Sequence, residues 1–293
     1  MPELPDVENY RSALAVRVLG RRLQRVEVAT PFLLRTVEPA PASAVGRTVT
    51  GVRRLGKRVV VALEGELFLV VHLMIAGRLH WTASGAKPVR RAHLATFDFE
   101  TGVLTLTEAG SKRRASLHVV RGEDALRALD RGGIEPLECG LERFAARLAE
   151  SNHTLKRALT DPRIFAGIGN AYSDEILHRA RLSPMKLTRG LDAEEALRLH
   201  AAAVAVLTEW TERLRAEAGS DFPTGVTAFR PEMAAHGRYR QPCPVCGTPI
   251  QRIVRGDTEC NYCPACQTEG RVLADRVLSR LLKDDWPTTV EEL

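Results

Sequence analysis

The chain begins Met1-Pro2-Glu3-Leu4-Pro5-Asp6-Val7-Glu8, and this stretch is the most informative part of its 293 residues. Initiator methionine is normally removed before a small residue, which predicts Pro2 as the mature N-terminus. An α-amino group has a pKa of about 8, so part of a Pro2 amine would be neutral and nucleophilic near pH 7. Its attack on a sugar C1′ would give an iminium ion, an electron sink for bond cleavage, and Glu3 could move the protons. The alternative is that Pro2 and Pro5 only stiffen the terminus.

The spacing of apolar residues divides the chain into a helix, a β-rich part and a helical part. Residues 6–19 place apolar side chains on one helical face and end at Gly20. Short β-rich runs separated by Gly and Pro follow over residues 21–120, which predicts an antiparallel sandwich. Residues 131–137 read as a linker. Further helices are expected at residues 141–150, 152–160, 170–181, 192–218 and 271–283, with a loop-like segment at 219–242.

The charge balance favours a polyanionic partner to a modest degree. The chain has 42 Lys and Arg against 36 Asp and Glu, a net charge of +6. Basic residues gather in short clusters, such as Arg53-Arg54, Lys57-Arg58 and Lys112-Arg113-Arg114, as on a phosphate-binding face, although surface arginines are often only solvated. No apolar run is long enough to span a membrane, and the first residues lack the features of a signal peptide, so we expect a cytoplasmic protein.

Five of the six cysteines lie between Cys243 and Cys266. Cys243-x2-Cys246 and Cys263-x2-Cys266 form a paired motif that predicts one structural Zn²⁺ held by four thiolates. Cys260 leaves an alternative second pair, Cys260-x2-Cys263. The remaining Cys139 is expected to be a buried structural thiol.

Two further motifs favour phosphate binding. Gly167-Ile-Gly169-Asn170 precedes a predicted helix, where backbone N–H groups and the positive helix end attract phosphate. Asn170 adds a side-chain donor, and Lys156 lies on the preceding helix; a simple turn with an N-cap is the alternative. Lys57 stands between a turn glycine and a β-run, and its alternative role is a solvated strand end.

Together the N-terminal string, the Gly-Asn helix and the four-cysteine motif resemble the formamidopyrimidine-DNA glycosylase / endonuclease VIII family of bifunctional DNA-repair enzymes. The resemblance covers about residues 1–268. It implies an α+β multidomain fold: a β-sandwich carrying the catalytic N-terminal helix, a helix–two-turn–helix domain and a zinc finger. The domains are expected at residues 1–130 (catalytic sandwich), 136–240 (helix–two-turn–helix), 241–268 (zinc finger) and 269–293 (a C-terminal extension helix packed on the helical domain through its apolar residues).

The resemblance also implies roles for individual residues. Pro2, Glu3 and Lys57 match the catalytic positions, with Lys57 holding phosphate near the scissile sugar. The expected DNA-binding residues are Arg54, Arg58, His72, Arg113, Arg114, Lys156, Gly169, Asn170, Arg238 and Arg255.

The chain departs from the family's pattern at three places, two of which bear on base flipping. Met74 or Ile75 must serve where the family has a methionine that fills the gap left by a flipped base. Ala115 stands where purine-excising members have a wedge phenylalanine, so either another side chain fills in or the substrate is already easy to extrude. Thr258 stands where the finger usually has its phosphate-binding arginine, and Arg255 is the expected substitute.

The resemblance therefore predicts a monomeric glycosylase and abasic-site lyase that acts on damaged DNA through a Pro2 iminium ion. The runner-up is a binder of abasic, cross-linked or single-stranded DNA without turnover on the same scaffold. A third reading, a zinc-ribbon RNA-binding protein, explains the cysteines and the charge but leaves the N-terminus unexplained.

Overall fold

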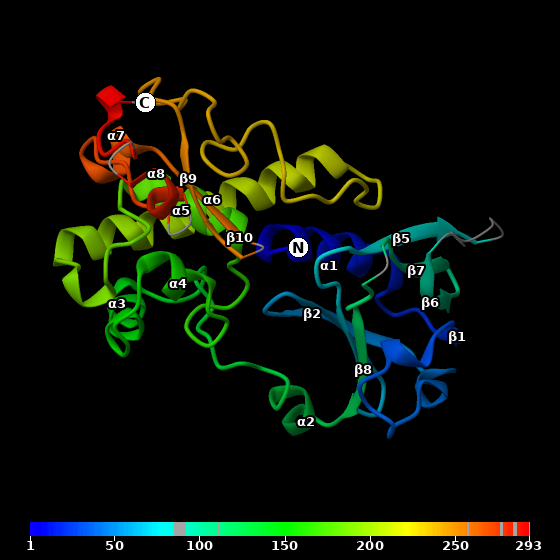
Figure 1. The fold of residues 1–293 in the computed structure, drawn as a ribbon. Helices are drawn as coiled ribbons and strands as arrows, with labels where there is room; N and C mark the ends of the chain where they lie inside the picture. Colours follow the sequence, from blue (N-terminus) through cyan, green and yellow to red (C-terminus); the bar gives the residue numbers. More distant parts are fainter. Residues whose placement is uncertain (85–91, 111, 257, 276–277, 284–285, 293) are drawn as a thin grey trace. The chain divides into compact units, whose positions relative to one another are not determined.

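The computed structural model describes the chain except for residues 85–91, 111, 257, 276–277, 284–285 and 293 (Figure 1). The described part separates into two compact units. Unit 1 comprises Met1–Arg131 and Trp210–Thr227, and unit 2 comprises Gly132–Glu209 and Ala228–Leu293.

Unit 1 contains two four-stranded antiparallel sheets and the N-terminal helix. The strand orders are β1-β6-β7-β5 and β2-β3-β4-β8, and consecutive neighbours pair antiparallel throughout. The elements are α1 (Leu4–Val18), β1 (Leu23–Val28), β2 (Val49–Leu55), β3 (Arg58–Leu63), β4 (Leu67–His72), β5 (Gly77–Ala83), β6 (His93–Phe99), β7 (Gly102–Glu108), β8 (Ser116–Arg121) and α2 (Glu123–Arg127).

One hydrophobic core joins α1 to the strands of unit 1. The apolar face of α1 contributes Val7, Tyr10, Leu14 and Val18, all of which are buried in that core. Strands β3 and β4 are almost continuously apolar because they are central and buried on both faces. The predicted sandwich with its N-terminal helix is therefore confirmed.

Unit 2 combines helices with a small metal-finger-like subdomain. Its elements are α3 (Leu141–Ala149), α4 (Leu155–Thr160), α5 (Asn170–Ala180), most of α6 (Ala193–Ala218), the hairpin strands β9 (Gln251–Arg255) and β10 (Thr258–Tyr262), α7 (Pro264–Thr268) and α8 (Leu278–Leu282). The four helices expected between residues 141 and 218 are present within a few residues of their predicted ends. Between α6 and the finger, residues 219–242 form neither helix nor strand, as their Gly and Pro content predicted.

The C-terminal helix differs from the expectation. Among the described residues it covers only Leu278–Leu282, and Leu281 is 74% exposed. The chain before it is extended instead, because the Val272 N–H donates to the carbonyl of Thr288 and Arg271 forms an antiparallel bridge with Thr289. Val277 lies outside the described residues, as does the side chain of Leu278. None of the helices in the described part of the chain is long and apolar enough to cross a membrane.

Candidate functional site

Pro2 and Glu3 are held at the start of α1 in unit 1. Both are buried, and Glu3 is only 2% exposed. Glu3 is the N-cap residue: its backbone N–H donates to Asp6 Oδ2 at 2.9 Å, and its carbonyl accepts from Val7 at 2.9 Å. The helix begins here because Pro5 suits the first turn and Asp6 complements the positive helix end. The two predicted catalytic residues are thus fixed in place by the helix start.

The surroundings of the N-terminal amine favour its neutral form. Burial is the largest cause, and it lowers the pKa of the Met1 amine. Arg78 and Lys57 lower this pKa further, whereas Glu3 and Asp6 raise it. Removal of Met1 would move the amine to Pro2, one residue along the same buried segment. Arg78, on β5, was not foreseen, because a lone arginine in a strand has no local signal of function.

The turn between β2 and β3 brings Lys57 near this amine, and its neighbours stabilise the turn. Gly56 has a positive φ of 57°, which lets the chain reverse between the strands. Arg54 donates to the Gly56 carbonyl at 3.1 Å and lies 3.7 Å from Glu8. Arg58 donates to the Leu129 carbonyl at 3.0 Å. Lys57 thus lowers the pKa of the Met1 amine, and Arg54 and Arg58 bind protein groups.

His72 ends β4 and is paired in register with Arg58 on β3 and Ser116 on β8. Burial is the main cause that lowers the His72 pKa to about 4, followed by repulsion from Arg58 and Lys57. The imidazole is therefore neutral at pH 7. It can donate one hydrogen bond and accept another, but it adds no positive charge for binding phosphate.

We expect His72 to make the stability of unit 1 depend on pH. The unfolded chain binds a proton at His72 near pH 6.5, but the folded chain does so only near pH 4. The folded state should therefore lose up to about 3 kcal/mol of stability as the pH falls through this window, and none above it. Urea unfolding between pH 4 and 7.5 should show a smaller loss for His72→Asn than for the parent. Parallel pH profiles for the two proteins would contradict this assignment.

Two loops of unit 1 present the side chains expected to act during base flipping. Ile75 is 58% exposed on the turn after β4, and this turn needs Gly77 because a Cβ there would lie 2.2 Å from the Leu73 carbonyl oxygen. In the other loop Arg113 and Arg114 are exposed, whereas Ala115 is buried. Of the two apolar residues, Ile75 is therefore exposed and could contact a base stack, whereas the buried Ala115 could not.

Glu108 anchors the arginine loop, and the sequence did not reveal this role. Its buried carboxylate accepts the Arg114 N–H at 2.9 Å through each oxygen and the Ala115 N–H at 3.0 Å. A carboxylate that accepts several backbone donors holds a loop firmly. Glu108 is six and seven residues from its partners, so only the folded loop brings them together.

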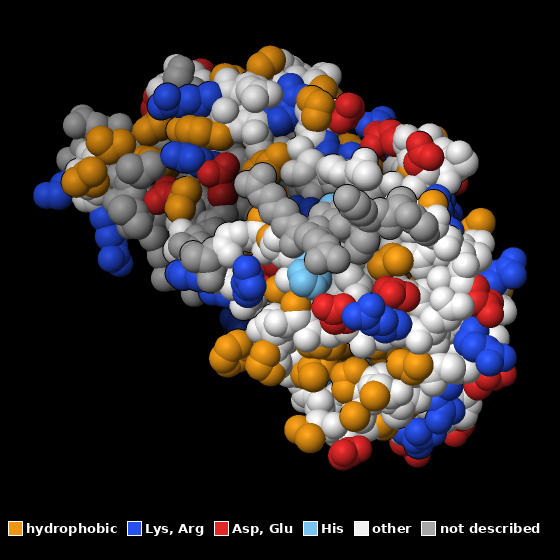
Figure 2. All heavy atoms as spheres, turned by 90° about the vertical axis from the view of Figure 1, so that its right-hand side faces the viewer, with side chains coloured by type: hydrophobic (Ala, Val, Ile, Leu, Met, Phe, Trp, Pro, Cys, Tyr) orange, Lys and Arg blue, Asp and Glu red, His pale blue; other side chains and the backbone are white. Residues whose placement is uncertain are grey.

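The exposed surface of unit 1 is not uniformly basic. Its exposed large hydrophobic residues include Phe32, Val37 and Val45. On the face drawn in Figure 2, hydrophobic side chains gather toward the lower edge, and Lys and Arg side chains are interspersed with Asp and Glu.

In unit 2 the predicted Gly-Asn motif begins α5. Gly169 is the N-cap residue, and Asn170 Nδ2 donates to the Glu259 carbonyl of β10 at 2.8 Å. Lys156 Nζ points inward: it lies 2.6 Å from Asp174 Oδ1 and donates to the Asn170 carbonyl at 2.7 Å. The motif thus joins α4, α5 and the finger hairpin, and the ammonium of Lys156 is committed to that junction.

Two consecutive carboxylates of α5 fix the loop that leads to the finger. Asp174, which is fully buried, also contacts His236 Nδ1 at 2.7 Å. Glu175 accepts the backbone N–H groups of residues 234, 235 and 236 at 2.7–2.9 Å, although burial raises its pKa. Arg238 donates to the carbonyls of Met233 at 3.1 Å and Pro242 at 3.3 Å. Residues 234–238 are therefore a braced loop, and its Arg238, which was expected to bind DNA, binds backbone carbonyls instead.

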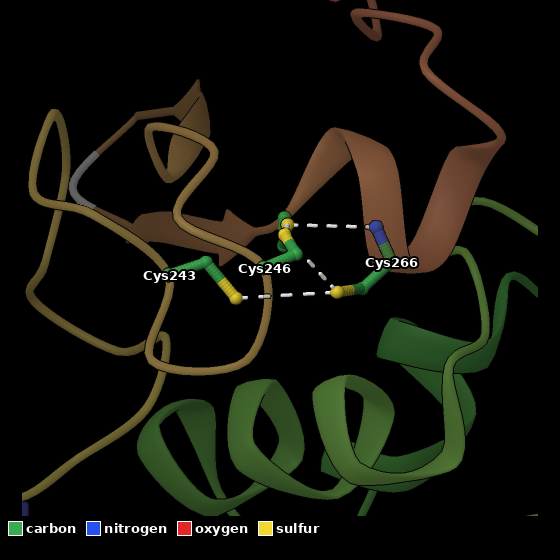
Figure 3. A group of neighbouring side chains, drawn as sticks. Cys243, Cys246 and Cys266 are labelled. Atoms are coloured by element: carbon green, nitrogen blue, oxygen red, sulfur yellow. Dashed lines mark hydrogen bonds between the residues drawn. The ribbon is translucent and has the colours of Figure 1, made fainter.

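The four predicted metal ligands come together in unit 2. The Sγ atoms of Cys243, Cys246, Cys263 and Cys266 all lie within 4.8 Å of one another. Figure 3 shows Cys243 and Cys246 on the loop before β9 and Cys266 on α7, with their sulfurs turned toward a common centre. Such a set of four soft thiolates suits a tetrahedral metal ion.

The protonation of the cluster also fits a cation. Burial disfavours the Cys246 thiolate, but hydrogen bonds from Thr248 and from neighbouring thiols lower its pKa to about 6. Burial, followed by the neighbouring Cys246, raises the pKa of Cys266 to about 11. The negative charge of the first thiolate thus disfavours ionisation of the next thiol, and a bound cation would relieve that repulsion. Cys260 is outside the cluster, and burial raises its thiol pKa strongly.

His178, on α5, touches this cluster from outside. Its Nε2 lies 3.2 Å from Cys243 Sγ, and both side chains are buried. A ring N–H at this distance can stabilise a metal-bound thiolate, the usual role of residues around a ligand set. The sequence contained no signal for it, since His178 is 65 residues from Cys243.

The structure does not describe the side chain of Arg255, so its predicted DNA contact lies outside the described residues. Thr258 is exposed and pairs with Arg255 at the end of the hairpin. The two residues therefore share the tip of the β9–β10 hairpin.

Comparison with known proteins identifies the class to which this architecture and these sites belong. The family model described as the formamidopyrimidine-DNA glycosylase N-terminal domain matches residues 1–115, and the one described as the H2TH domain of the same enzymes matches residues 133–218. The chain belongs to the formamidopyrimidine-DNA glycosylase family. Enzymes of this family are glycosylases of base excision repair that also cleave DNA at abasic sites.

Individual relatives match over nearly their whole length. The chain is 39% identical over 279 residues to formamidopyrimidine-DNA glycosylase from Thermus thermophilus, matching 92% of this chain and all of the relative. A formamidopyrimidine-DNA glycosylase from Symbiobacterium thermophilum is 34% identical over 287 residues, matching 94% of this chain and 93% of the relative.

Solved structures match in the same way. The crystal structure of MutM (Fpg) from Thermus thermophilus superposes with a TM-score of 0.77 at 37% identity, covering 92% of this chain and all of that one. Lactococcus lactis Fpg in complex with DNA containing an abasic site gives a TM-score of 0.80 at 25% identity, covering 91% and 99%.

Proposed function

We propose that this chain excises damaged bases through an iminium intermediate on Pro2 and then cleaves the strand by β-elimination, with or without a following δ-elimination. The observation that carries the proposal is the N-terminal segment. Pro2 and Glu3 are buried at the positive end of α1, and burial together with Arg78 and Lys57 lowers the pKa of the neighbouring Met1 amine, whose place a Pro2 amine would take after removal of Met1. A neutral amine is the form that attacks carbon.

The chemistry assigns a role to each residue. The Pro2 nitrogen attacks C1′, and the base departs with the electron pair of the glycosidic bond. Glu3 accepts the proton of the attacking nitrogen and transfers it to the ring oxygen O4′; the C1′–O4′ bond breaks, and the nitrogen lone pair that this frees forms the iminium ion. Loss of a C2′ proton then expels the 3′ phosphate, with Lys57 holding phosphate near the sugar.

DNA binding is proposed to rest on residues of both units. Asn170 and Gly169 at the start of α5, together with Arg113 and Arg114, are the candidates for phosphate and base contacts. Arg54, Arg58, Lys156 and Arg238 support these elements through the protein contacts described above, and neutral His72 serves as a hydrogen-bonding group. Ile75 is the candidate to fill the gap left by a flipped base.

The metal is proposed to be a single structural Zn²⁺, because four thiolates in a paired C-x2-C arrangement are its usual site. The partner is damaged DNA, and the protein is expected to act as a monomer on chromosomal DNA in the cytoplasm. Metal analysis should give one zinc per chain, and light scattering should give one chain per particle.

Borohydride trapping tests the function directly. Oligonucleotides carrying an abasic site, formamidopyrimidine, 8-oxoguanine or an oxidised pyrimidine are incubated with protein whose intact mass confirms removal of Met1. We expect a covalent adduct with the abasic site and with at least one damaged base. No adduct on any of them would favour the alternative, a non-catalytic binder of damaged DNA. If RNA competed better than damaged duplex DNA, an RNA-binding role would be favoured instead.

A further inference from the structure

The segment after the finger, residues 269–293, follows the last of the four clustered cysteines. Its described parts turn back on one another: the Val272 N–H donates to the Thr288 carbonyl at 2.8 Å, and the Val290 N–H donates to the Gly270 carbonyl at 2.9 Å. Residues 270–272 and 288–290 are therefore held side by side.

Two hydrogen bonds connect this C-terminal segment to both strands of the finger hairpin. Asp275 Oδ2 accepts the backbone N–H of Val254, on β9, at 2.6 Å. The Leu273 N–H donates to the hydroxyl of Tyr262, on β10, at 2.7 Å. Asp275 is 1% exposed and Tyr262 is fully buried. A buried carboxylate bound to a backbone donor makes a strong bond, and loss of the carboxylate would leave that donor unsatisfied.

The hairpin depends on its neighbours for support, and the loop before the finger supplies part of it: Asn261 Oδ1 of β10 accepts the Gly237 N–H at 2.8 Å, and Arg252 of β9 lies over the Tyr239 ring. A two-stranded hairpin is marginally stable by itself. The β10 strand is also held by Asn170, which donates to the Glu259 carbonyl. β9 is held by Asp275 of the C-terminal segment. The predicted phosphate-binding motif of α5 thus holds β10 through Asn170. The C-terminal segment holds β9 through Asp275 and β10 through Tyr262.

We propose that the C-terminal segment is an intramolecular brace, in which Asp275 and Tyr262 fix the β9–β10 hairpin in the orientation that binds DNA phosphate. Asp275 is a positioning residue: it acts through the Val254 backbone and does not touch DNA. This inference rests on the proposed function, because it assumes that the hairpin tip contacts DNA. The proposal gives the segment a role in DNA affinity, although Asp275 is negatively charged.

The sign of the effect on affinity separates a brace from simple electrostatics. Asp275→Ala removes one negative charge and the bond to Val254. Glu291→Ala removes the same charge from an exposed position of the same segment. Charge removal alone should strengthen DNA binding slightly. A brace predicts the opposite for Asp275→Ala, about a tenfold loss of affinity, from the loss of a buried charge-assisted hydrogen bond. Asp275→Asn keeps an acceptor oxygen and should remain within about threefold of the parent.

The experiment measures affinity for a duplex containing a non-cleavable abasic-site analogue, together with amide exchange at Val254 and zinc content. We expect Asp275→Ala to lose affinity, to exchange the Val254 amide at least about tenfold faster and to keep its zinc. Equal or tighter binding by Asp275→Ala, as for Glu291→Ala, would overturn the proposal. So would an unchanged exchange rate at Val254.

Failure of the proposed function would look different. The parent protein itself would then neither bind the abasic analogue nor be trapped by borohydride, whereas the exchange measurement would still report on the brace. Should Asp275→Ala fold poorly, Tyr262→Phe removes the other connection and should lower affinity in the same direction.

Discussion

Pro2→Gly and Glu3→Gln are expected to abolish trapping and strand cleavage while DNA binding is retained. The Pro2 ring makes the attacking nitrogen a secondary amine, so its iminium ion keeps a permanent positive charge that a glycine imine can lose. Glu3→Gln keeps the size of the side chain but cannot transfer a proton, which should cost about 10²–10⁴ in rate. Neither change removes a core side chain of α1, whose apolar face packs through Val7, Tyr10 and Leu14.

The measurement is single-turnover cleavage of an abasic-site duplex, with affinity for a non-cleavable analogue measured in parallel. Pro5→Ala is the matched control, because it changes the other proline of the N-terminal segment and leaves the amine intact. If Pro5→Ala lost as much activity as Pro2→Gly, the prolines would act by stiffening the terminus. Parental rates for both Pro2→Gly and Glu3→Gln would rule out the proposed mechanism.

The pH profile of the reaction offers a further readout of the same site. Burial lowers the pKa of the Met1 amine, and Arg78 contributes in the same direction. We expect the same surroundings to act on the Pro2 amine after removal of Met1. The neutral amine should therefore persist below pH 8, and cleavage should reach its plateau at a lower pH than an exposed amine would allow. Arg78→Gln removes a repulsive cation, so the acid limb of the profile should move to higher pH.

Cys266→Ser is expected to abolish metal binding and to weaken DNA binding strongly, whereas Cys260→Ser should keep the metal. The core of the finger consists of Ala235, Cys243, Ile250 and Cys263, with Cys266 packed against it, and so it is built largely from the ligands themselves. A subdomain with so small a core depends on its metal, since structural zinc commonly contributes about 10–16 kcal/mol to folding. Loss of the metal should therefore unfold the hairpin that carries Arg255 and Thr258.

Metal content per chain and affinity for abasic-site DNA are the two quantities to measure. Amide exchange in α1 and β3 should stay at the parental level, because these elements belong to unit 1 and share no core with the finger. The opposite pattern, with metal kept in Cys266→Ser and lost in Cys260→Ser, would assign the second ligand pair to Cys260 and Cys263.

Local sequence was sufficient to predict the helices and strands that have a regular pattern of apolar residues. The α1 helix shows a regular apolar face, and β3 and β4 are continuous apolar runs. The paired C-x2-C motif also depends only on spacing. By contrast β5 and β6 have no simple apolar pattern, because polar residues such as His80 and Asp98 stand among their apolar ones.

The tertiary structure alone decided what the charged side chains do. Lys156 and Arg238 were expected to bind DNA because of the resemblance to the glycosylase family, but in the folded chain Lys156 binds Asp174 and Arg238 donates to backbone carbonyls. Asp275, in a segment predicted to be helical, instead binds the backbone of Val254. The physical reason is that charge type and spacing are local properties, whereas the partner that satisfies a charge is brought to it by the fold.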